Sequence, residues 1–208
     1  MENLNFVLFI SIATPLTMML FVCKDRTRAL IVSFLTGMVT CLFSGEVAGL
    51  IAKGTDFSTA YIVTNFTPLF EELCKLAPIL FYVLVFRPNK QQLIEYSLAV
   101  GAGFAVQENA YILALPTTEA SLLLAIVRGF GAGMLHAVST LGTGYGIGFI
   151  RNRRKFFAPY TMALLTAAVA YHVAYIQLLQ SPYEKIAITL PMLTFALIVV
   201  MMKRQKWL

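Results

Sequence analysis

The chain has few charged residues and few cysteines. Only 12% of its 208 residues are charged, whereas 59% are hydrophobic, and the mean hydropathy is +0.77. This composition excludes an ordinary soluble domain and indicates a polytopic membrane protein. Cys23, Cys41 and Cys74 form no CxxC pair, which argues against a disulfide framework or a thiolate zinc site. The sequence also has no HExxH motif, no obvious internal repeat and no phosphate-binding glycine loop.

The long hydrophobic stretches predict an all-α bundle of about seven transmembrane helices. A helix needs about 20 apolar residues to cross the hydrocarbon. The connections are short, so we expect residues 1–208 to form a single transmembrane domain. The first stretch lacks a basic lead and is long enough to span, so we expect a helix there rather than a cleavable signal. The predicted spans are residues 4–23, 29–52, 61–86, 92–115, 121–150, 156–180 and 185–202.

The basic residues orient the predicted bundle, because most of them gather at alternate ends of the spans. The opposite loops hold only Lys53 and Lys185. The positive-inside rule therefore predicts a cytoplasmic C-terminus and an N-terminus outside. The net charge of +6 then reflects topology, and we expect no nucleic-acid partner. The cations of the basic ends are Lys24, Arg26, Arg28, Arg87, Lys90, Arg151, Arg153, Arg154, Lys155, Lys203, Arg204 and Lys206.

Several ionisable side chains lie inside the predicted spans, where each costs several kcal/mol unless it is paired or faces water. With the orientation above, Glu108 and His172 each lie about seven residues, or about 10 Å, from the outer ends of their spans. Separate segments thus bring polar groups to one layer in the outer half, which predicts a shared site and favours catalysis inside the membrane. The group comprises Glu71, Glu72, Lys75, Glu108, Asn109, Arg128, His136 and His172.

The residue spacing suggests how these side chains divide their roles. Glu71 and Glu72 point about 100° apart on a helix, so only one can face a given centre squarely. Lys75 follows at the spacing of an intrahelical ion pair, and a purely structural pair is the alternative interpretation. His136 and His172 can serve as general bases or as metal ligands. Both could instead be packing residues, although two histidines beside glutamates at matching depth favour a function.

Four motifs in chain order carry a family resemblance. The first is EExxK, formed by Glu71, Glu72 and Lys75; the second is a GxGFAxxEN-like run that ends at Glu108 and Asn109. An intramembrane histidine after an arginine-bearing helix start follows (His136 after Arg128), and then a late histidine (His172). From about residue 60 to 176, the chain resembles the PrsW family of intramembrane proteases, which is related to the type II CAAX-prenyl endopeptidases. Those relatives usually carry Arg where Lys75 stands and His where Glu108 stands, so both positions favour PrsW.

The resemblance implies peptide-bond hydrolysis at or within the membrane, with a protease core at about residues 60–180. It implies a membrane-protein or peptide substrate in the lipid bilayer, for example an anti-sigma factor cut first on the extracytoplasmic side. An integral protein of a bacterial or archaeal plasma membrane is the expected setting. The sequence leaves the oligomeric state open.

Two arrangements of the predicted site are compatible with amide hydrolysis, and in both Glu71 or Glu72 is the general base. In the first, His136, His172 and Glu108 bind Zn²⁺ and leave one position for water. In the second, no metal is used; a Glu–His pair activates water, and the other histidine with Asn109 or Arg128 stabilises the oxyanion. The predicted catalytic residues are Glu71, Glu72, Glu108, His136 and His172, and the supporting residues are Lys75, Asn109 and Arg128.

Two other classes of membrane protein also place charged residues inside spans. Transporters and proton relays do so, but they predict paired helix interruptions or internal repeats, which the sequence lacks. A non-catalytic membrane scaffold related to these proteases could dispense with the glutamates, and this chain keeps both Glu71 and Glu72. We therefore expect a protease.

Overall fold

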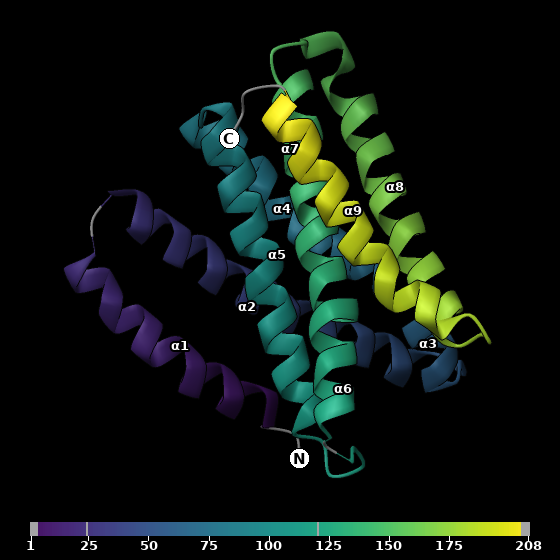
Figure 1. Ribbon diagram of the computed structural model, residues 1–208. Coiled ribbons are helices and arrows are strands. Elements are labelled where there is room, and N and C mark those ends of the chain that lie inside the picture. Colours follow the sequence, from purple (N-terminus) through teal and green to yellow (C-terminus); the bar gives the residue numbers. More distant parts are fainter. Residues whose placement is uncertain (1–3, 24, 120, 205–208) are drawn as a thin grey trace.

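The computed structural model describes residues 4–23, 25–119 and 121–204, and these residues form helices and no strands (Figure 1). This confirms the predicted all-α class. The elements are α1 (Leu4–Val22), α2 (Asp25–Gly54), α3 (Thr59–Asn65), α4 (Thr67–Phe86), α5 (Lys90–Leu113), α6 (Leu122–Val127), the π-helix η1 (Arg128–Gly133), α7 (Met134–Ile150), α8 (Arg154–Leu179) and α9 (Glu184–Arg204).

Five helical stretches in the described part of the chain are long and apolar enough to cross a membrane. They are α1, α2, the continuous α6–η1–α7 segment, α8 and α9. The helices α4 and α5 have 20 and 24 residues, but charged side chains such as Glu72, Lys75 and Glu108 lower their apolar character. A membrane protein is thus confirmed, while the count of seven and the orientation of the termini stay predictions. Lys24, Lys206 and both chain ends lie outside the described residues.

Two predicted spans are less regular than the hydropathy pattern indicated. The span predicted at 61–86 is two helices, α3 and α4, which meet at Phe66. Pro68 lies in the first turn of α4, where its missing N–H costs nothing, so it begins this helix. The span predicted at 121–150 contains the π-helix η1 in its N-terminal half, so it is not the regular α-helix that we expected.

The helix α5 lies at the centre of the bundle, between α2 and α7 (Figure 1). Two glycines let its neighbours approach closely. A Cβ on Gly103 would lie 1.9 Å from the carbonyl oxygen of Phe34 in α2, and one on Gly101 would lie 2.6 Å from that of His136 in α7. A capping box of Asn89 and Gln92 begins α5. These contacts fix α5 between its two neighbours.

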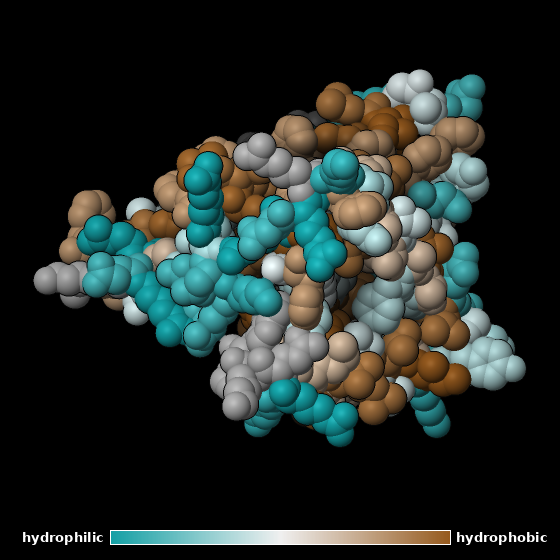
Figure 2. Space-filling view, turned by 90° about the horizontal axis from the view of Figure 1, so that it is seen from above, coloured by the Kyte–Doolittle hydropathy of each residue, from teal (hydrophilic) through white to brown (hydrophobic). Residues whose placement is uncertain are grey.

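The two ends of the bundle differ in polarity. At one end lie the α1–α2, α4–α5 and α7–α8 connections and the C-terminal end of α9. Hydrophilic side chains gather over this end, which we call the basic end (Figure 2). The opposite end carries α3, α6 and the α8–α9 turn (Figure 1). The predicted intramembrane residues all belong to the half nearer this second end.

Candidate active site

The helix α4 supplies three charged side chains that are all buried. Lys75 is only 1% exposed, and its Nζ lies 2.6 Å from Oε1 of Glu72. The same ammonium lies 4.8 Å from the ring centroid of Phe104 in α5, a cation–π distance. Ser139 of α7 also donates to Glu72 Oε2, at 3.2 Å. The carboxylate of Glu72 is therefore held by donors, as the predicted ion pair requires.

The imidazole of His136, on α7, is oriented by contacts at both of its nitrogens. Its Nε2 lies 2.8 Å from Oε2 of Glu108, and its Nδ1 lies 3.0 Å from Nζ of Lys75. A carboxylate accepts and an ammonium donates, so these neighbours favour the tautomer with the proton on Nε2 and a lone pair on Nδ1. The lone pair of His136 then points toward α4.

The imidazole of His172, on α8, follows the same pattern with the nitrogens exchanged. Its Nδ1 lies 3.1 Å from Oε1 of Glu72, and its Nε2 lies 3.7 Å from Oε2 of Glu71. Glu72 therefore favours the tautomer with the proton on Nδ1, which leaves the Nε2 lone pair facing Glu71. A carboxylate that fixes the tautomer and ring orientation of a histidine is a frequent companion of metal ligation.

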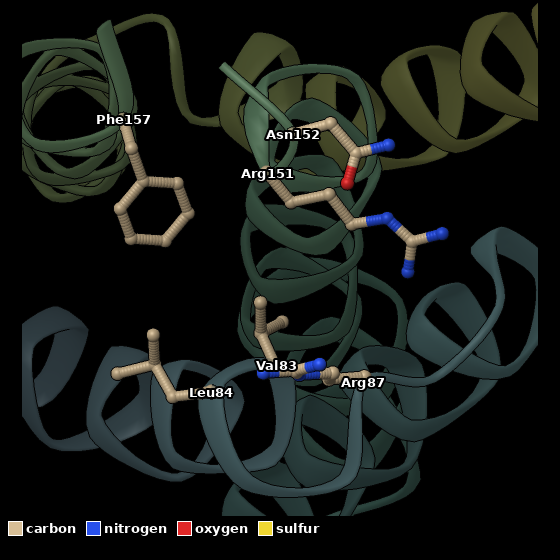
Figure 3. Close-up of a pocket in the computed structure, with 6 residues that line it drawn as sticks. All are labelled: Val83, Leu84, Arg87, Arg151, Asn152 and Phe157. Carbon is tan, nitrogen blue, oxygen red and sulfur yellow. The ribbon is translucent and has the colours of Figure 1, made fainter. Parts of the chain in front are cut away.

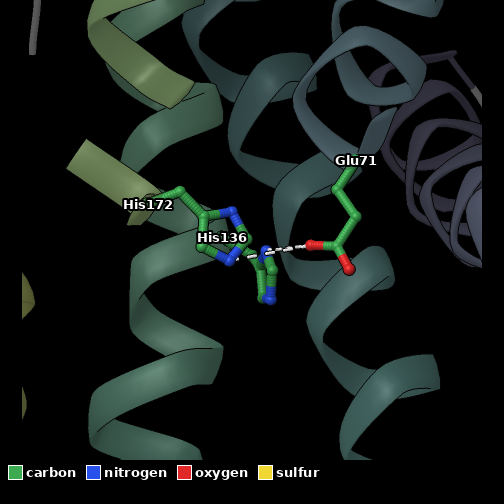
Figure 4. Close-up of side chains that lie close together, drawn as sticks. All are labelled: Glu71, His136 and His172. Carbon is green, nitrogen blue, oxygen red and sulfur yellow. Dashed lines mark ion pairs between the residues drawn. The ribbon is translucent and has the colours of Figure 1, made fainter. Parts of the chain in front are cut away.

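The side chains of Glu71, His136 and His172 converge on one point (Figure 4). Oε2 of Glu71 lies 3.7 Å from Nε2 of His172 and 4.0 Å from Nδ1 of His136. This oxygen is buried and has no hydrogen-bond partner. The three candidate ligand atoms lie within 4.8 Å of one another. A tetrahedral ion with bonds of about 2.1 Å places its ligands about 3.4 Å apart, so a small inward movement would let these residues hold a divalent metal.

Comparison with known proteins agrees with this geometry. A family model described as PrsW family intramembrane metalloprotease matches residues 25–202. The chain belongs to this family. The match confirms the resemblance seen in the sequence, and it supports intramembrane proteolysis as the general activity. It begins after α1 and includes every predicted site residue. No curated protein and no solved structure matches the chain.

The remaining predicted residues of this PrsW-family chain lie at the edge of the same cluster. Arg128 lies 2.9 Å from Oε2 of Glu108, and its Nε donates to Oδ1 of Asn109 at 2.9 Å. The side-chain amide of Asn109 donates back to the carbonyl of Arg128 at 3.3 Å. Glu108 and Arg128 are partly exposed, at 21% and 16%. The structure thus brings together all eight residues that the sequence singled out.

The structure groups a different carboxylate with the two histidines than the sequence did. The predicted ligand set contained Glu108, whereas Glu71 is the acid whose oxygen faces the lone pairs of both rings. Glu108 instead contacts Nε2 of His136, on the opposite side of that ring. This placement favours Glu108 as the residue that orients His136.

The π-helix η1 positions Arg128 relative to His136. Oε2 of Glu108 lies within 2.9 Å of both side chains, although Arg128 begins η1 and His136 lies in α7. The wider turn of a π-helix changes the angle between residues on either side of it, and such turns are frequent at functional sites. No residue pattern in the sequence indicated this turn.

Ser139, on α7, contacts both His136 and Glu72. At i+3 from His136, it could orient the imidazole ring, and its hydroxyl indeed lies 3.2 Å from the carbonyl oxygen of His136. The same hydroxyl also donates to the carboxylate of Glu72 on another helix. The position of Ser139 on the His136 face of α7 was visible in the sequence, but its partner on α4 was not.

Proposed function

We propose that this PrsW-family protein is an intramembrane endopeptidase whose metal is held by Glu71, His136 and His172. The observation that carries the proposal is the buried Oε2 of Glu71, which has no hydrogen-bond partner and faces both imidazoles. One carboxylate and two imidazoles suit Zn²⁺, and three protein ligands leave a fourth position for water or substrate. When bound, the metal would polarise the scissile carbonyl and lower the pKa of water.

The chain's other side chains supply orientation and charge. Glu72 and Glu108 fix the tautomers of His172 and His136, and so direct the two lone pairs toward Glu71. The ammonium of Lys75 lies 3.0 Å from Nδ1 of His136, and its positive charge beside the site can stabilise negative charge that develops on the reacting carbonyl. Arg128 and Asn109, at the more exposed edge, can bind the backbone of the substrate.

A metal-free mechanism on the same residues is the second candidate. It is favoured by the contact between Lys75 Nζ and His136 Nδ1, because the ammonium approaches the nitrogen that a metal would need. In this version Glu71 takes a proton from water, and the resulting hydroxide attacks the peptide carbonyl. Arg128 or Asn109 then stabilises the oxyanion, and the proton passes to the leaving amine. Glu71 is indispensable in both versions.

We further propose that cleavage occurs near the extracytoplasmic side of the membrane, in single-span substrates such as an anti-sigma factor. The support is the charge distribution. The site belongs to the half of the bundle away from the basic end, and the positive-inside rule assigns the basic end to the cytoplasm. The family match favours such a protease over a transporter or a scaffold.

The deciding experiment measures metal and activity together. The full chain, purified in detergent, is compared with Glu71→Gln, with Glu46→Gln as the matched control, because Glu46 is an exposed acid on α2. Zinc content is determined by elemental mass spectrometry, and cleavage is followed with casein. We expect about one zinc per chain in wild type and in Glu46→Gln, and neither zinc nor cleavage in Glu71→Gln.

The possible results separate the two mechanisms. Cleavage that persists after chelation, but is lost in Glu71→Gln, would select the metal-free version. Cleavage that survives in Glu71→Gln would contradict the proposed site. Zinc bound equally by wild type and Glu71→Gln would contradict the ligand assignment.

A further inference from the structure

A cavity of about 640 Å³ opens at the basic end of the bundle, far from the candidate active site. It lies between the C-terminal end of α4 and the α7–α8 turn (Figure 3). Arg87 lies fifteen residues after Glu72, which corresponds to about 22 Å along a helix. Sites for small molecules and cofactors commonly have volumes of about 300–1,000 Å³. This cavity is therefore large enough for a ligand of its own.

The lining of the cavity divides into a polar part and an apolar part. Arg87, Arg151 and Asn152 supply cationic and amide groups, and the side chains of Val83, Leu84 and Phe157 supply the apolar part (Figure 3). Leu84 is 65% exposed, so the apolar part continues onto the outer surface of the bundle. A ligand that fits such a lining combines an anionic group with a hydrocarbon chain.

The two arginines retain unused hydrogen-bonding capacity. Arg151 donates through one terminal nitrogen to the carbonyl of Pro88, but its Nε is buried without a partner. Arg87 adopts a left-handed conformation (φ 49°) at the end of α4, and its exposed side chain forms no ion pair with any described residue. A buried donor without an acceptor destabilises the protein, so an anion that accepts a hydrogen bond from Nε of Arg151 would be stabilised there.

The acids at the basic end do not neutralise these arginines. Within the described residues, Glu95 forms an ion pair with Arg26. Asp25 lines a separate cavity between α2, α4 and α5. A basic pocket between transmembrane helices, on the side to which the positive-inside rule assigns the cytoplasm, is the type of site that binds anionic lipid headgroups.

We propose that this cavity binds the phosphate of an anionic phospholipid. The phosphate lies between the guanidinium groups of Arg87 and Arg151, and an acyl chain runs along Leu84 and Phe157 toward the bilayer. Guanidinium–phosphate hydrogen bonds are charge-assisted and frequently bidentate, which gives the site its preference for phosphate. The apolar part of the lining distinguishes a phospholipid from free phosphate.

The test uses the full chain in detergent, with three probes added separately: phosphatidylglycerol, phosphatidylcholine and inorganic phosphate. Bound lipid is counted by native mass spectrometry, and the thermal midpoint is recorded for each mixture. The variants are Arg87→Gln and Arg151→Gln. The matched control is Arg153→Gln, an exposed arginine at the same end that does not line the cavity. Arg87→Gln removes no ion pair within the described residues, so it should fold even if Arg151→Gln does not.

We expect phosphatidylglycerol to bind wild type and Arg153→Gln and to raise their thermal midpoints, and Arg87→Gln to weaken that binding at least about tenfold. An effect of inorganic phosphate as large as that of phosphatidylglycerol would keep the phosphate site but assign it to a soluble ligand. Equal binding of phosphatidylglycerol and phosphatidylcholine, or equal losses in Arg87→Gln and Arg153→Gln, would overturn the proposal.

Discussion

Each of the two histidines uses one ring nitrogen to contact a carboxylate and turns the other toward Glu71. The three glutamates of the cluster therefore have different surroundings. Glu72 accepts hydrogen bonds from several donors, and Glu108 contacts His136 and Arg128. Of the three, Glu71 is the one with a buried oxygen that has no hydrogen-bond partner within the described residues. Substituting each of the three glutamates should therefore lower metal affinity by a different amount.

Glutamine substitutions test this ranking. Glu71→Gln removes a proposed ligand, so we expect no zinc retention at micromolar concentrations. Glu108→Gln leaves the ligands in place but weakens the contact that orients His136, so zinc affinity should fall only about 10- to 100-fold. Competition with a chromophoric chelator measures both affinities. A larger loss of zinc affinity in Glu108→Gln than in Glu71→Gln would support the ligand set predicted from the sequence, in which Glu108 stands in place of Glu71.

The buried Glu72–Lys75 pair permits a test of stability. Lys75→Met leaves the carboxylate of Glu72 buried without its ammonium partner, which should lower stability by about 3–5 kcal/mol. The double variant Glu72→Gln/Lys75→Met removes both charges and should recover part of the loss. Unfolding in mixed detergent micelles provides the comparison. Equal stability of wild type and Lys75→Met would show that Glu72 does not depend on this pair.

The residue types of the site could be predicted from the sequence, but their mutual contacts could not. Ionisable groups are so costly inside a span that all eight members were recognisable without coordinates. The division of roles between Glu71 and Glu108 depends on the rotation of α4 and α5 about their axes. A difference of about 100° decides which of two adjacent glutamates faces the histidines, and hydropathy does not report that angle.

At the level of elements, close packing between α5 and α7 determines where His136 lies. The Cα of Gly101 faces the backbone of α7 at His136 and Ala137. A side chain at this position would separate the two helices and move His136 away from Glu71 and His172. Small residues at such crossings are typical of helix packing in membranes.

Alanine substitutions test this dependence. We expect Gly101→Ala to lower stability by roughly 1–3 kcal/mol and to reduce cleavage, because its Cβ would lie 2.6 Å from the carbonyl oxygen of His136. Gly49→Ala in α2 is the matched control, because a Cβ there meets no atom within 4 Å. Thermal unfolding and casein cleavage provide the readouts. Full activity in Gly101→Ala would show that the α5–α7 spacing does not control the site.

The positions of the helices were largely predictable, and their irregularities were not. The seven spans that we predicted from the lengths of the hydrophobic stretches all lie on helices of the structure. The break at Phe66 and the π-helix η1 were not placed by hydropathy, because the span prediction averages over many residues and does not register a short polar or glycine-rich stretch within them. Both irregularities lie near the site, and η1 contains Arg128 but no proline that would mark a break.

For the whole molecule, the predicted orientation can be tested by labelling. In a variant whose native cysteines are replaced by alanine, single cysteines are introduced at Asp56 and at Asn152, which lie in connections at opposite ends of the bundle. A membrane-impermeant maleimide added to intact cells should label Asp56→Cys and spare Asn152→Cys until the cells are opened. Labelling of Asn152→Cys in intact cells would reverse the orientation, and with it the proposed side of cleavage.

The side chains of the proposed centre come from α4, α5, α7 and α8, so it needs residues that are about a hundred positions apart in the chain. At about 5–20 residues per second, roughly 5–20 s separate the synthesis of Glu71 from that of His172. During the first part of that interval Glu71 lacks both histidine partners, and after the synthesis of His136 it still lacks His172. With the proposed ligand set, a nascent chain cannot cut its neighbours in the membrane, and hydrolysis becomes possible only once α8 has joined the bundle.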